Sequence, residues 1–63
     1  MASPMVNQDL REANDLAKDV YAAVEDAELT RSPAMLEKAQ LAVARLQAKL
    51  DLAQLHMDLE ARS

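Results

Sequence analysis

The chain has 63 residues, a formal net charge of −4 at pH 7, no glycine and no cysteine. A chain of this length forms one small domain and buries only about 60% of the surface that its unfolded form exposes. The lack of cysteine excludes a disulfide framework and thiolate metal sites, and the lack of glycine excludes glycine-rich phosphate-binding loops and most β-hairpin turns. No apolar run is long enough to cross a membrane and no signal peptide opens the chain, so we expect a cytoplasmic protein.

Two serine–proline pairs, Ser3-Pro4 and Ser32-Pro33, mark the predicted starts of two helices. Serine is a good N-cap, and proline is well suited to the first helical position because the N–H that it lacks would have no partner there. The sequence predicts a first helix over about residues 4–29, a loop over about 30–32 and a second helix over about 33–61. Since the loop is short, the helices are expected to be antiparallel neighbours in a single all-α, coiled-coil-like hairpin domain spanning residues 1–63.

Apolar residues recur along both predicted helices with alternating spacings of three and four. This is the pattern of left-handed antiparallel helix packing, and it predicts the side chains that close the hairpin. In the first helix these are Val6, Leu10, Ala13, Ala17, Val20, Val24 and Ala27, and in the second Leu36, Ala39, Val43, Leu46, Leu50, Ala53 and Met57.

The second predicted helix carries another apolar line almost opposite the first, at about 100° per residue. One partner helix cannot cover both lines, so we expect an outer interface there. Its predicted residues are Leu41, Ala48, Leu52, Leu55 and Leu59. The most direct way to cover them is a homodimer in which two hairpins form a four-helix bundle, and the alternative is a groove or helix on another protein.

Charge is divided unequally between the two helices. The first carries a net charge of −5 and the rest of the chain a net charge of +1, which together give the total of −4. Such flanking charges set the orientation and partner choice of packed helices. The candidate charged contacts are Lys38, Arg45 and Lys49 on the second helix and Asp9, Glu12, Asp15 and Asp19 on the first.

Residues suited to catalysis or metal binding are few. His56, with Glu60 one turn later, supplies too few ligands for a tight metal site. Glu12, Asp15 and Asp19 share a helix face but lack the Glu-x-x-His motif of di-metal bundles. Nucleophilic catalysis needs a nucleophile, a base and a group that orients the base. This chain has one histidine, and its hydroxyl side chains lie at the predicted helix ends, so such a site cannot be assembled. We therefore expect no enzyme activity, no metal, no cofactor and no small-molecule substrate.

These observations favour a small protein-binding module, an adaptor, regulator or assembly factor that acts through helix–helix contacts. The expected hairpin dimer resembles in design, with no matched residues, the plasmid-copy-control RNA-binding hairpin Rop. RNA binding is therefore an alternative, with Lys38, Arg45 and Lys49 contacting phosphates, although the acidic charge and the single aromatic residue count against it. A second alternative is an acidic inhibitor that occupies a basic nucleic-acid-binding surface of a target protein.

Overall fold

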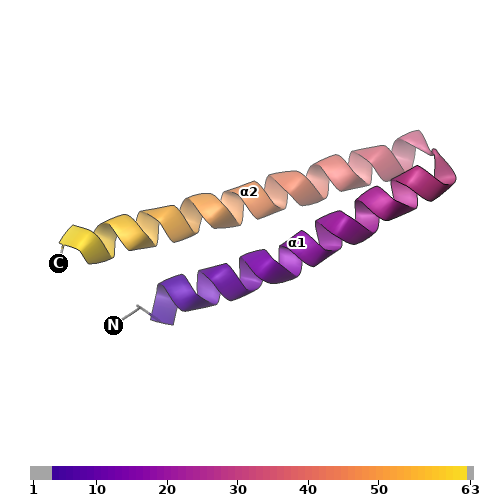
Figure 1. Cartoon of the computed structure of the whole chain (residues 1–63). Helices are drawn as coiled ribbons and strands as arrows, with labels where there is room; N and C mark the ends of the chain where they lie inside the picture. The colour runs from indigo at the N-terminus through magenta and orange to yellow at the C-terminus, as the bar shows by residue number, and fades with distance from the viewer. Residues whose placement is uncertain (1–3, 63) are drawn as a thin grey trace.

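A computed structural model describes residues 4–62 as two long antiparallel helices (Figure 1). Helix α1 is Pro4–Thr30 and helix α2 is Pro33–Arg62, so each extends one residue beyond the predicted end. The helices pack along their length into a rod with extents of 48 × 14 × 10 Å. The predicted all-α hairpin is confirmed. Within residues 4–62, neither helix combines the length and apolarity needed to span a bilayer.

Two residues, Arg31 and Ser32, connect the helices. Arg31 has a φ of 54°, the left-handed conformation that often ends a helix, and its N–H donates to the Ala27 carbonyl at 2.8 Å. The carbonyl of Ser32 then accepts from the N–H groups of Met35 and Leu36, both at 3.1 Å, which closes the first turn of α2. The predicted Ser3 cap lies outside the described residues.

The seam, which is the set of positions where each helix faces the other, differs at every second position from the residues predicted to close the hairpin. Val6, Ala13, Val20 and Ala27 of α1 and Ala39, Leu46 and Ala53 of α2 are buried or half-buried, as predicted. The remaining seam positions lie one residue earlier in the chain than predicted, at Asp9, Leu16, Ala23, Met35, Ala42, Lys49 and His56. The prediction was therefore wrong for Leu10, Ala17, Val24, Leu36, Val43, Leu50 and Met57, which are exposed.

The difference corresponds to a rotation of each helix by about 50°, half of the angle between successive residues. Small side chains explain it, because the distance between packed helices depends on the residues at the contact. Ala13, Ala23, Ala39 and Ala53 are between 3% and 7% exposed and allow the backbones to approach closely. The same rotation brings Asp9 against His56, a polar contact that the predicted seam would not make.

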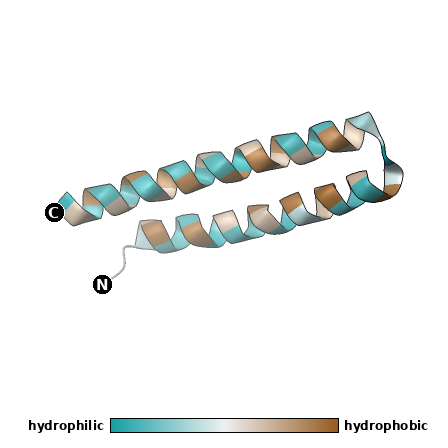
Figure 2. Ribbon diagram, turned by 45° about the horizontal axis from the view of Figure 1, so that its top comes forward, coloured by the Kyte–Doolittle hydropathy of each residue, from teal (hydrophilic) through white to brown (hydrophobic). Residues whose placement is uncertain are grey.

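The interior of the hairpin is consequently small. Of the described residues, the buried apolar ones are Val6 and four alanines, and no large side chain is fully buried. Hydrophobic residues nevertheless recur along the whole length of both helices (Figure 2). Most of the large apolar surface of this chain therefore lies outside the seam.

Candidate interaction surfaces

Two polar pairs connect the helices near the open end of the hairpin. Asp9 Oδ2 contacts His56 Nδ1, with side chains that are only 8% and 17% exposed. Glu12 Oε2 lies 2.6 Å from Lys49 Nζ, and these side chains are 42% and 25% exposed. Both pairs join α1 to α2 across the seam, so they fix the alignment of the two helices along their axes.

The Glu12–Lys49 contact changes the titration of both groups. The hydrogen bond from Lys49, assisted by one from the Gln8 amide at 3.2 Å, lowers the pKa of Glu12 below its ordinary value of 4.5. The hydrogen bond to Glu12 raises the pKa of Lys49 above its ordinary value of 10.5. Both charged forms are therefore favoured at neutral pH.

One long face of the hairpin is apolar and uncharged, and we call it the neutral face. It consists of Leu10 and Val24 from α1, with Leu36, Val43, Leu50 and Met57 from α2, between 41% and 55% exposed. Residues seven apart lie on one side of a packed helix, so Leu10 aligns with Val24 and each α2 residue aligns with the next.

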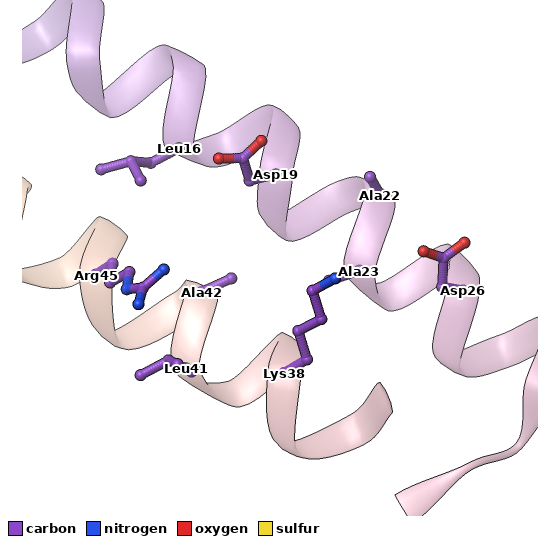
Figure 3. Close-up of a pocket in the computed structure, with 9 residues that line it drawn as sticks. All are labelled: Leu16, Asp19, Ala22, Ala23, Asp26, Lys38, Leu41, Ala42 and Arg45. Atoms are coloured by element: carbon purple, nitrogen blue, oxygen red, sulfur yellow. The ribbon is translucent and has the colours of Figure 1, made fainter. Parts of the chain in front are cut away.

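The opposite face has a charged cleft of about 330 Å³ (Figure 3). Asp19 and Asp26 of α1 line one side of this cleft and Lys38 and Arg45 of α2 line the other, with an apolar floor between the two helices. The buried or half-buried residues Leu16, Ala23 and Ala42 form this floor, and the exposed residues Ala22 and Leu41 lie at the rim. Within residues 4–62, none of the four charged side chains takes part in an ion pair, so the two signs of charge remain separated by the cleft.

The predicted outer interface lies on the cleft side of α2 and is exposed. Ala48 is exposed, and the four leucines of the set are between 37% and 52% exposed: Leu41, Leu52, Leu55 and Leu59. Leu41 lies at the rim of the cleft, and the other leucines continue toward the end of α2. Within residues 4–62, two extended rows of apolar residues are therefore exposed, the neutral face built from both helices and this outer stripe built from α2 alone.

The predicted charged contacts divide into three groups. Asp9 is 6% exposed and contacts His56 inside the seam, so it does not belong to the exposed acidic surface. Glu12 and Lys49 pair with each other. The side chains that remain available to a partner are Asp15, Asp19, Lys38 and Arg45, and the last three line the cleft.

Sequence reasoning did not identify the two polar pairs, because it placed the charged residues on the flanks of the helices and none of them in the contact between the helices. A signal was present. Asp9 and His56 lie at nearly equal distances in sequence from Arg31-Ser32, and Glu12 and Lys49 do so as well. In an antiparallel hairpin such positions lie side by side, and in each pair a carboxylate meets a group that can carry a positive charge.

Among residues 4–62, no group of three or more histidine, aspartate or glutamate side chains is arranged to hold a metal ion. Comparisons with models of protein families, with curated proteins and with solved structures gave no match to this chain. A functional proposal therefore depends on the two surfaces themselves.

Proposed function

We propose that the chain is a small, non-enzymatic protein-binding module that acts through helix–helix contacts, with a second copy of itself as its first partner. The observation that carries this proposal is the placement of most of the large apolar side chains on the outside of the hairpin, while the seam is rich in alanine and is joined by two polar pairs. Exposed apolar surface of this extent in a small domain is typical of surfaces that bind protein.

The energetic gain from covering these side chains is large for a chain of 63 residues. Full burial of a leucine, valine or methionine side chain contributes about 1.5–3 kcal/mol. Covering six side chains that are about half-exposed therefore contributes about 4–9 kcal/mol per copy. The whole stability of a domain of this length is about 3–9 kcal/mol. Association would thus contribute as much as folding, in the way that helices of a four-helix bundle stabilise one another.

Binding to nucleic acid, the principal alternative, receives less support from the cleft. Lys38 and Arg45 are exposed there, but Asp19 and Asp26 line the same cleft. Their negative charges oppose the approach of phosphate groups, and the net charge of −4 acts in the same direction. Lys49, the third basic residue of the predicted strip, is already paired with Glu12.

Sedimentation equilibrium of the full chain between about 5 and 200 μM, a range that brackets typical weak dimers, tests the proposal. We expect a mass twice the 6.9 kDa of one chain, changing little between low and high salt because the contacts are apolar. A mass of one chain throughout the range would overturn the proposal. A large complex formed with added RNA duplex, and lost steeply as salt increases, would favour the alternative.

A further inference from the structure

The hairpin offers two apolar surfaces to a second copy, and they differ in width and in charge. The neutral face draws on both helices, whereas the outer stripe follows α2 alone. We infer that the second copy binds on the neutral face, at Leu10, Val24, Leu36, Val43, Leu50 and Met57, and that the outer stripe and the cleft stay exposed in the dimer. This inference rests on the proposed self-association and adds the surface that performs it.

Charge favours the neutral face. Two copies that each carry a net charge of −4 repel one another, so they associate best where few charges come together. The positions that border the neutral face are also uncharged over most of its length, apart from Glu28 near the loop. They are Asn7, Asn14 and Tyr21 on α1 and Gln40, Gln47 and Gln54 on α2.

Two of the glutamines at this border are held by their own helix. The Gln47 amide donates to Asp51 Oδ1 at 2.9 Å, and the Gln54 amide donates to Asp58 Oδ1 at 3.1 Å. These bonds satisfy two of the border amides with carboxylates one helical turn further along α2. The border therefore supplies the polar rim that surrounds the apolar centre of a protein–protein interface.

The other side of the hairpin is a poorer surface for a second copy. Contact there would remove Asp19, Asp26, Lys38 and Arg45 from water, and none of them has an ion-pair partner within the described part of the chain. Taking unpaired charges out of water is costly unless each meets a well-placed partner. The neutral face requires no such arrangement.

The size of the neutral face also suits a stable dimer. From Leu36 to Met57 the face extends over 21 helical steps, or about 32 Å at 1.5 Å per residue. Two adjacent helices of about 10 Å diameter make this side of the hairpin about 20 Å wide, which gives roughly 600 Å² with the polar border included. Stable interfaces use about 600–1,000 Å² per partner, so this area lies at the lower end of that range.

Leucines on the two surfaces provide a matched test. Leu50 and Leu55 both lie in α2 and are 41% and 52% exposed, but Leu50 is on the neutral face and Leu55 on the outer stripe. The experiment compares the full chain, Leu50→Glu and Leu55→Glu by sedimentation equilibrium, with circular dichroism to verify that each is helical. We expect Leu50→Glu to raise the dimer dissociation constant by about 100-fold or more, because each dimer then contains two buried carboxylates. Leu55→Glu should change the dimer dissociation constant by less than about threefold relative to the unmodified chain.

A milder pair keeps the test decisive if a glutamate variant loses its helices. Leu50→Ala and Leu55→Ala preserve helix propensity and remove only apolar contact. The dimer dissociation constant should rise about tenfold in the first variant and stay nearly unchanged in the second. The inference would be overturned if the changes at Leu55 raised the dimer dissociation constant, or if the changes at the two positions raised it equally. Self-association itself would still stand in either case. A full chain that is monomeric would instead overturn the proposed function itself.

Discussion

Replacing the Asp9–His56 pair with leucines is expected to stabilise the protein, whereas replacing only one member is not. The Asp9 side chain is 8% exposed and that of His56 is 17% exposed, so two leucines there would be largely buried. They contribute about 1.5–3 kcal/mol each. Losing the polar contact costs about 1.5–3 kcal/mol. The double variant Asp9→Leu with His56→Leu should therefore be more stable by about 1–3 kcal/mol.

The single variant His56→Leu leaves the Asp9 carboxylate buried without its partner, at a cost of about 1–3 kcal/mol that offsets the gain from the new leucine. Urea denaturation at one fixed protein concentration, followed by circular dichroism, gives the four free energies of unfolding of a double-mutant cycle. We expect a coupling energy of about 1–3 kcal/mol between the two positions. The same cycle with Asp15, an exposed aspartate of α1, should show coupling below about 0.5 kcal/mol. If His56→Leu alone stabilised the protein as much as the double variant, the contact with Asp9 would contribute nothing.

Three further changes test the loop, the seam and the ion pair. Arg31→Gly should raise the free energy of unfolding by about 1 kcal/mol, since glycine adopts the φ of 54° without strain, and Arg31→Ala should give no such gain in the same urea titration. Ala53→Leu should lower the free energy of unfolding by about 1–3 kcal/mol, because Ala53 is 3% exposed and has no room for a larger side chain. Ala48→Leu, at an exposed position, should lower it by less than about 0.5 kcal/mol, and thermal denaturation measures both changes. The lowered pKa of Glu12 gives stability that is fully present above pH 4.5 and lost as the pH falls through the folded-state value. The stability advantage of the wild type over Glu12→Gln should therefore shrink on acidification, and an advantage that persisted well below pH 4.5 would contradict the assigned contact.

The hairpin was predictable from the sequence because its signals are local. Ser32-Pro33 begins α2 at the predicted residue, and the short break before it leaves the helices no arrangement other than antiparallel neighbours. The left-handed conformation of Arg31, which ends α1, was harder to predict, because glycine normally marks that position and this chain has no glycine.

The alignment of the seam was harder to predict, because three- and four-residue spacing fits two sets of positions in this chain. One set contains Leu36 and Leu50, and the other contains Ala42 and Lys49. Hydrophobicity favours the first set. The structure has the second, since close approach of the backbones at alanine and two polar contacts between the helices outweigh burial of the larger residues.

The residues of the neutral face were therefore recognised as apolar from the sequence but were wrongly assigned to the contact between the two helices of one hairpin. Leu10, Val24 and Val43 were placed against the other helix of the same hairpin, and the structure exposes all three. A single chain shows which residues are apolar and how they repeat, but not whether the helix that covers them comes from the same molecule.

The alanine-rich seam also has a consequence for the heat capacity of unfolding. That heat capacity rises with the apolar area newly exposed when a protein unfolds. Among residues 4–62 the buried apolar residues are Val6 and four alanines, so unfolding of the hairpin exposes less new apolar area than unfolding of a leucine-filled seam would, and we expect a shallow stability curve. If a dimer covered Leu10, Leu36, Leu50 and Met57, their exposure on unfolding would increase the heat capacity of unfolding. Calorimetry at increasing protein concentration would then show the unfolding transition sharpen and move to higher temperature as the second copy binds.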